Sequence, residues 1–173
     1  MAAALTRLRT SLTQNWPLKL LTLLALVVPV ILLLRAWSSL PESVPVHFDA
    51  SGTPDRFGPK GSLWILHWVS FGMWLMFTAI QALPLRSINL PVKVTPENAA
   101  HVQRVSARAL SGVKFVMVLV LALIGQQTLK AAVGDDSGLS VWLMLLAPLG
   151  PLPVLIWLVV AAGRKPTTGS AAR

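Results

Sequence analysis

The sequence contains no cysteine, and few of its residues carry a charge. The absence of cysteine excludes disulfide bonds, thiol catalysis and metal sites with thiolate ligands. Only 12% of the 173 residues are charged, which is about half the usual share. Residues 61–85 and 137–163 contain no Lys, Arg, Asp or Glu at all, whereas 54% of the whole chain is hydrophobic. These shortages indicate an integral membrane protein.

Four stretches are apolar enough to cross a bilayer, because about 20 apolar residues span its hydrocarbon core. We predict spans at about residues 17–36, 62–83, 111–133 and 139–162. Two of these contain shorter apolar runs, and long cationic side chains beside them can reach the interface. The flanking cations are Lys19, Arg35, Lys114 and Lys130. The predicted fold is therefore an all-α integral membrane domain over residues 1–163, with a disordered tail at 164–173.

The net charge of +9 fits the positive-inside pattern better than a nucleic-acid interface. Under the four-span arrangement, eleven of the fifteen basic residues fall on one side, together with the single acid Glu97. They are Arg7, Arg9, Lys19, Arg86, Lys93, Arg104, Arg108, Lys114, Arg164, Lys165 and Arg173. Both termini are therefore predicted to be cytoplasmic, with anionic lipids at that face. We expect no nucleic-acid partner. We also expect the first helix to stay uncleaved, because Arg35 stands where a signal-peptide cleavage site needs small residues.

Two further segments carry structural signals. Thr95-Pro96-Glu97 has the residue types of a helix start, and Glu97, His101, Arg104 and Arg108 then share one face. We predict a cytoplasmic amphipathic segment that continues into the third span, lying beside lipid headgroups or binding a partner. Residues 148–153 hold three prolines and a glycine, so the fourth span is predicted to be broken there. Such a break is either a packed kink or a transport site.

The connection between the first two spans, residues 38–60, is long and rigid in composition. Four prolines and two glycines favour an ordered extracytoplasmic cap. We predict an extended segment at 44–49, a turn at 49–52 and a second turn at 53–56. The side chains expected on its apolar face are Val44, Val46 and Phe48.

Polar residues of this connection are the main candidate site. The predicted partner-binding residues are His47, Phe48, Asp49, Gly52, Asp55, Arg56 and Lys60. His47, Asp49 and Asp55 also offer ligands for zinc or manganese. The alternative is that Asp49 binds turn amides while Asp55 pairs with Arg56 or Lys60. No activated nucleophile can be assembled, so we predict that the protein is not an enzyme.

His67 is a separate candidate, because it lies about one and a half turns inside the second span. Intramembrane ionisable residues often mark a ligand or proton site. A histidine among aromatic side chains could also ligate a tetrapyrrole, although we expect no cofactor. Simple packing against a neighbouring helix is the alternative. Ser70, Trp74, Thr78 and Gln81 follow at helical spacing, so this stripe can form hydrogen bonds.

The connection also resembles a known family signature. Leu40-Pro41, Val44-Pro45-Val46-His47-Phe48, Gly52-Thr53-Pro54-Asp55 and Gly58-Pro59-Lys60 are similar to its "LP…IP.HF…G.PD..G.K" pattern. The pattern marks a bacterial membrane family of unknown function, domain of unknown function 1648, the module that opens SdpI-like immunity and signalling proteins. The resemblance covers roughly residues 15–135.

The resemblance implies a non-enzymatic protein of the bacterial inner membrane whose external loop recognises a peptide or partner protein, in sensing or immunity. Two alternatives remain at this stage. One is a small accessory subunit of a larger membrane complex, respiratory or photosynthetic. The other is a small transporter that works at the broken fourth span.

Overall fold

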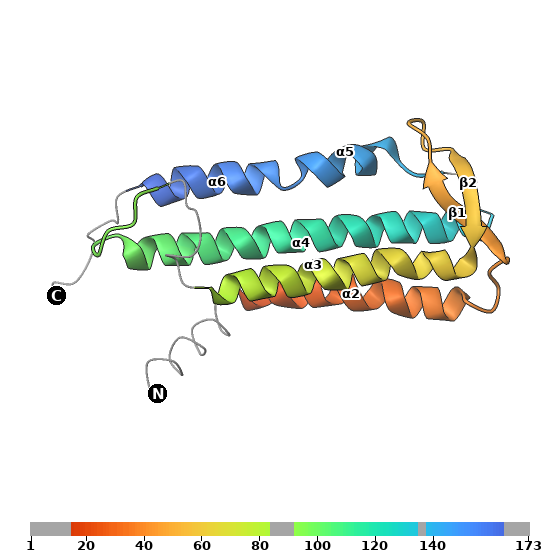
Figure 1. Ribbon diagram of the computed structural model, residues 1–173, viewed down its shortest axis with the longest axis horizontal. Coiled ribbons are helices and arrows are strands. Elements are labelled where there is room, and N and C mark those ends of the chain that lie inside the picture. The colour runs from red at the N-terminus through yellow and green to blue at the C-terminus, as the bar shows by residue number, and fades with distance from the viewer. Residues whose placement is uncertain (1–14, 84–91, 135–137, 165–173) are drawn as a thin grey trace.

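A computed structural model describes residues 15–83, 92–134 and 138–164, and they form helices and one β-hairpin. The elements are α2 (Trp16–Ala36), β1 (Ser43–Phe48), β2 (Pro54–Pro59), the short 3-10 helix η1 (Lys60–Leu63), α3 (Trp64–Ala82), α4 (Ala99–Ala132), α5 (Val141–Leu149) and α6 (Leu152–Gly163). The helices lie along one long axis, and the hairpin lies across one end of them (Figure 1). We call this the hairpin end and the other the opposite end.

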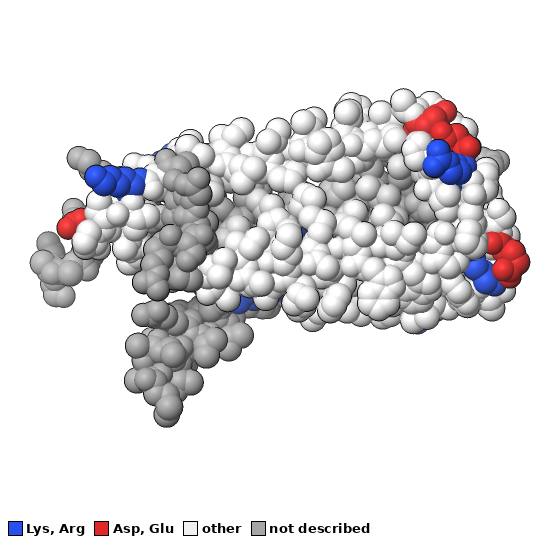
Figure 2. Space-filling view, in the orientation of Figure 1, with Lys and Arg blue, Asp and Glu red and all other residues white. Residues whose placement is uncertain are grey.

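Four helical segments in the described residues are long and apolar enough to cross a membrane. They are Trp16–Ala36, Lys60–Ala82, Ala99–Ala132 and Val141–Gly163. Charged side chains gather at the two ends of the molecule, while the flank between them is almost entirely uncharged (Figure 2). Large apolar side chains on this flank are exposed, as expected where hydrocarbon rather than water surrounds the protein. The prediction of four apolar spans is confirmed.

Helix α4 is the central element of the bundle. It packs against α2, α3, α5 and α6, and it also contacts β1. In its apolar window 39% of residues are buried, against 17% in α2 and 6% in the α5–α6 segment. Its 34 residues rise about 50 Å, which exceeds a hydrocarbon core of about 30 Å. The amphipathic segment and the third span are therefore one continuous helix.

The start of α4 differs from the predicted helix start at Thr95. The backbone N–H groups of Asn98 and Ala99 both donate to the Thr95 carbonyl, at 3.2 and 2.9 Å, which closes a turn before the helix begins. The Asn98 side chain accepts from the Thr95 N–H at 2.8 Å and donates to the Lys93 carbonyl at 3.0 Å. A hydrogen bond from Thr95 lowers the pKa of the exposed Glu97 in this turn. The helix therefore begins at Ala99, four residues after Thr95.

The fourth span is broken as predicted, between Leu149 and Leu152. Pro151 has no N–H to donate, so the helical hydrogen bonding stops at this point. An added Cβ on Gly150 would lie 2.9 Å from Val116 Cγ1 of α4, so only a glycine fits without displacing that side chain. The break is thus a closely packed kink against the central helix.

The observed hairpin differs in two details from the predicted connection between the first two spans. Residues 53–56 do not form a second turn, because Pro54–Pro59 is the strand β2, antiparallel to β1. The single face expected for Val44, Val46 and Phe48 is also wrong. Irregular pairing between Pro45 and Phe48 breaks the alternation. Val44 and Phe48 are consequently buried, whereas Val46 is 40% exposed.

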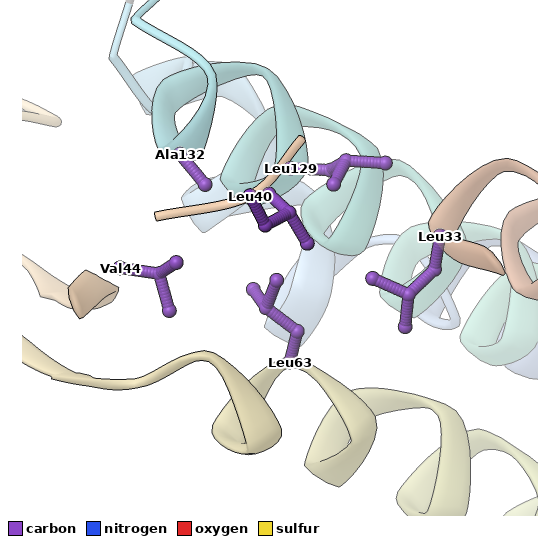
Figure 3. Packing of buried hydrophobic residues seen from close by; sticks show 6 residues of the cluster. All are labelled: Leu33, Leu40, Val44, Leu63, Leu129 and Ala132. Carbon is purple, nitrogen blue, oxygen red and sulfur yellow. The ribbon is translucent and has the colours of Figure 1, made fainter. Parts of the chain in front are cut away.

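An apolar cluster joins the hairpin to the helix ends. Its buried members are Leu33, Leu40, Val44, Leu63, Leu129 and Ala132 (Figure 3). They come from α2, the segment before β1, β1 itself, η1 and α4. Trp37 and Trp64 pack against the cluster with ring centroids 6.0 Å apart. Burial of this shared apolar surface holds the hairpin against the bundle.

The hairpin turn is also held by a contact between two backbone segments. The Leu139 N–H donates to the Gly52 carbonyl at 2.8 Å. Gly52 has a φ of 84°, and a Cβ at this position would overlap the Leu139 carbonyl oxygen. Gly138 has a φ of 63°, and its Cβ would lie 2.6 Å from the Gly52 oxygen. We call this the glycine clasp; it ties the hairpin turn to the segment that precedes α5.

Some sequence-based predictions fall on residues 1–14, 84–91, 135–137 and 165–173, which lie outside the described residues. They include the predicted disordered tail, of which only Arg164 is described. Five of the eleven basic residues on one side also fall there. These are Arg7, Arg9, Arg86, Lys165 and Arg173.

Replacing Gly52 by alanine should destabilise the protein more than the same change at Gly134. Both glycines have a positive φ, which costs about 1–2 kcal/mol for an alanine. Only Gly52 faces another backbone segment, since nothing lies within 4 Å of a Cβ on Gly134. Thermal unfolding in detergent should show a clearly larger decrease in Tm for Gly52→Ala. Equal decreases would contradict the glycine clasp.

Candidate functional site

Asp49 builds the hairpin turn. Its Oδ1 accepts hydrogen bonds from the Ser51 N–H at 2.9 Å, the Ser51 hydroxyl at 2.6 Å and the Thr53 N–H at 2.9 Å. These bonds, with that from the Ser51 hydroxyl first, lower the pKa of Asp49 below its ordinary value of 3.8. The alternative in which Asp49 binds turn amides is therefore the observed one.

Two further pairs of polar side chains form at the hairpin, and Arg56 belongs to neither. His47 Nδ1 donates to Asp55 Oδ1 at 2.6 Å, and the two side chains are 55% and 46% exposed. Lys60 Nζ donates to Glu42 Oε1 at 2.7 Å and lies 5.6 Å from the centroid of the Trp37 ring. Asp55 thus pairs with neither Arg56 nor Lys60. Exposed pairs of this kind add little stability, so they leave His47 and Asp55 available to contact another molecule.

The seven predicted partner-binding residues divide by exposure. Phe48 and Gly52 are buried beneath the hairpin, and Asp49 and Lys60 are partly buried. His47, Asp55 and Arg56 are exposed, and Arg56 forms no ion pair within the described residues. Phe57, which the sequence analysis did not single out, is 58% exposed on β2. In the register of the two strands, Arg56 lies opposite His47, and Phe57 lies opposite Pro45.

The hairpin does not assemble the metal ligands considered above. The described residues contain no group of three His, Cys, Asp or Glu side chains that could hold a metal ion. His47 and Asp55 bind each other, while one oxygen of Asp49 already accepts three hydrogen bonds from the turn.

His67 lies at a small cavity between α2, α3 and α4. Its Nδ1 donates to the Leu63 carbonyl at 3.0 Å, while its Nε2 is buried with no partner among the described residues. The cavity has a volume of about 10 Å³, which is room for about one water molecule. Ala25 and Pro29 line its other side, and Pro29 leaves the Ala25 carbonyl without its helical donor.

A second polar cluster, around Lys114, was missed by the sequence analysis. Lys114 was predicted to extend to the interface, but it is only 6% exposed and lies between α3 and α4. Its Nζ donates to Gln81 Oε1 at 3.0 Å and to Thr78 Oγ1 at 3.3 Å. Gln81 Nε2 in turn donates to Ser111 Oγ at 3.0 Å. The prediction that Lys114 reaches the interface failed because α4 continues beyond the span. The Lys114 side chain therefore points toward α3.

The directions of these hydrogen bonds are fixed by the helix backbone. Thr78 and Ser111 donate their hydroxyl protons to the carbonyls of Trp74 and Ala107, at 2.6 and 2.8 Å. Both hydroxyl oxygens can therefore only accept from the cluster, and this sets the orientation of the Gln81 amide. Within the described residues, Lys114 has no carboxylate partner. The spacing of Thr78 and Gln81, facing Ser111 and Lys114, was the available sequence signal, since both pairs are three residues apart.

Comparison with known proteins places a family segment over the hairpin and its flanking helices. Residues 24–77 match the family described as "Domain of unknown function (DUF1648)", from within α2 to within α3. The match is narrower than the expected residues 15–135. The matched segment contains the later part of α2, the hairpin, η1 and most of α3.

One similar protein is an uncharacterized protein of Archaeoglobus fulgidus. It is 48% identical over 46 residues, which is 27% of this chain and 25% of that protein. The aligned part thus spans about a quarter of the relative's length. No solved structure matches this chain at a significant level.

The Asp49 turn should respond to acid. Because the pKa of Asp49 is lowered by folding, its stabilising effect is present above pH 3.8 and is lost as the pH falls through the lower folded-state pKa. The amide resonances of Ser51 and Thr53 should shift with a midpoint below pH 3.8 in an NMR titration. Asp49→Asn should remove this step, whereas Glu42→Gln should keep it. A midpoint at or above 3.8 would contradict the assignment.

The Lys114 cluster should tolerate loss of the amine better than loss of its acceptor. Gln81→Leu leaves a buried donor without its partner, which costs about 1–3 kcal/mol. Lys114→Met removes the donor itself and keeps most of the apolar packing. Thermal unfolding should therefore show a lower Tm for Gln81→Leu than for Lys114→Met. Adding Lys114→Met to Gln81→Leu should restore part of the loss, and strictly additive effects would argue against the cluster.

Proposed function

We propose that this protein is a non-enzymatic membrane protein whose hairpin recognises a peptide or partner protein outside the cytoplasm, in sensing or immunity. The observation that carries the proposal is an exposed aromatic residue, Phe57, on a hairpin that the glycine clasp and the apolar cluster hold in place. An aromatic side chain on a pre-organised surface gives contact area with little loss of conformational entropy on binding.

The proposed recognition surface consists of five of the exposed hairpin residues. They are Val46, His47, Asp55, Arg56 and Phe57. Val46 and Phe57 offer apolar contact, while Arg56 offers a cation that no ion pair within the described residues neutralises. This combination suits an extended peptide with an apolar side chain beside an acidic one. Asp49, Phe48 and Gly52 shape the surface from within.

The proposed location is a bacterial cytoplasmic membrane, with the hairpin outside and both termini inside. The distribution of charge supports it. The opposite end carries the basic residues Lys93, Arg104, Arg108 and Arg164. Among the described residues, Glu97 is the single acid at that end. At the hairpin end, the basic residues Arg35, Arg56, Lys60 and Lys130 lie with the acids Glu42, Asp49 and Asp55. The more basic end of a membrane protein normally stays in the cytoplasm.

The accessory-subunit and transporter alternatives have less support from the geometry. The kink at Gly150 is packed closely against Val116 of α4, which supports a structural role for the break. The flank seen in Figure 2 is almost entirely uncharged and exposes many large apolar side chains, and contact with lipid alone satisfies such a surface. The recognition proposal instead explains why a membrane bundle carries a rigid hairpin with an exposed aromatic residue.

The proposal predicts a discrete crosslink from position 57. A photoreactive amino acid replacing Phe57 should yield one reproducible adduct in membranes of the native host, and Arg56→Glu in the same chain should weaken it. The matched control is Ile65 of α3, which is 59% exposed on the lipid-facing flank. No discrete adduct at position 57 beyond that at position 65 would refute recognition by the hairpin.

A separate labelling experiment checks the topology, because a chain without cysteine accepts single reporter thiols. Ser51→Cys on the hairpin should react with a maleimide that cannot cross the membrane. Gln103→Cys, exposed on α4 at the opposite end, should not react in sealed cells. Labelling of Gln103→Cys alone would reverse the orientation and refute an external hairpin.

A further inference from the structure

A groove at the opposite end lies between α2 and α6, on the surface of α4. Its volume is about 380 Å³, within the usual range of ligand sites. Asn15 and Leu18 line it from the start of α2, Arg108 from α4, and Pro153, Val154 and Trp157 from α6. The groove is independent of the hairpin and of its proposed function.

The lining of this groove is apolar except near the start of α2. Leu18, Pro153, Val154 and Trp157 form apolar walls, while Arg108 and Asn15 supply polar groups. Arg108 is exposed and has no ion-pair partner within the described residues. The Arg108 guanidinium is therefore the one cation at the side of a groove whose remaining lining, apart from Asn15, is apolar.

The position of the groove relates it to the bilayer. Arg108 lies ten residues into the long helix α4, level with the first residues of α2, where the apolar span of α2 begins. Gly112, one turn further along α4, approaches Val154, since its Cβ would lie 3.1 Å from Val154 Cγ1. The cation thus lies near headgroup depth, and the apolar walls extend toward the hydrocarbon.

We propose that this groove binds one anionic phospholipid, with its phosphate at Arg108 and an acyl chain against Leu18, Val154 and Trp157. A phosphate ester complements an unpaired arginine, and the apolar walls complement hydrocarbon. A basic pocket between transmembrane helices is a recognised setting for an anionic headgroup. Trp157 places its amphipathic ring in the same groove, as interfacial tryptophans do.

Arg104 provides a matched control for charge. It lies one turn before Arg108 on the same helix, is also exposed, and does not line the groove. Its replacement removes the same charge from the same helix. An effect confined to Arg108 therefore reports a built site and not general attraction of lipids to a basic face.

Native mass spectrometry of the full chain in mild detergent tests the proposal. The purified protein should bind one phosphatidylglycerol in preference to phosphatidylcholine. Arg108→Gln should weaken phosphatidylglycerol binding at least fivefold, as expected for one cation near a lipid headgroup, whereas Arg104→Gln should leave it unchanged. Val154→Trp, which fills the groove, should reduce binding of both lipids.

Soluble glycerol phosphate separates a lipid site from a site for free phosphate esters. It should not compete with phosphatidylglycerol, because it lacks the chain that the apolar walls bind. Effective competition, equal binding of phosphatidylcholine, or equal losses in the Arg104→Gln and Arg108→Gln variants would each overturn the proposal. Arg108 is exposed, so its replacement should not prevent folding.

Discussion

The seating of the hairpin on the helix ends is the constraint on which the other features depend. Four helices in lipid gain little from apolar contact with one another, because the surrounding hydrocarbon offers a similar environment. The hairpin end is different, since Leu40, Val44 and Leu63 lie in one cluster with residues of α2 and α4. That cluster removes apolar surface near the membrane boundary, and the glycine clasp adds a contact between backbones.

The sequence predicts the membrane architecture well because the apolar runs and the prolines act locally. The four spans, the broken fourth helix and the turn at Asp49 each depend on residues close together in the chain. Two local predictions failed for reasons that lie elsewhere. Residues 53–56 become a strand because they pair with β1, and Val46 becomes exposed because the pairing is irregular.

The candidate sites were harder to predict because they depend on contacts between distant residues. The place of Lys114 beside an apolar run is typical of an interfacial anchor. Only its packing against Thr78 and Gln81 shows that it is buried. Asp55 pairs with His47 and not with its neighbour Arg56, which follows from the register of two strands. Phe57 stands out only when its exposure is known. The periodicity of residue types within one segment does not indicate such contacts between segments.

The glycine clasp gives the two halves of the bundle a mechanical connection. Helices α2 and α3 and the segment α5–α6 pack separately against α4, but Gly52 also touches Leu139 at the start of the last segment. Backbone atoms make this link, so it has little slack compared with one made by flexible side chains. A ligand that displaces the hairpin turn would therefore also displace the start of α5. The displacement would pass along the helices toward the opposite end of the molecule.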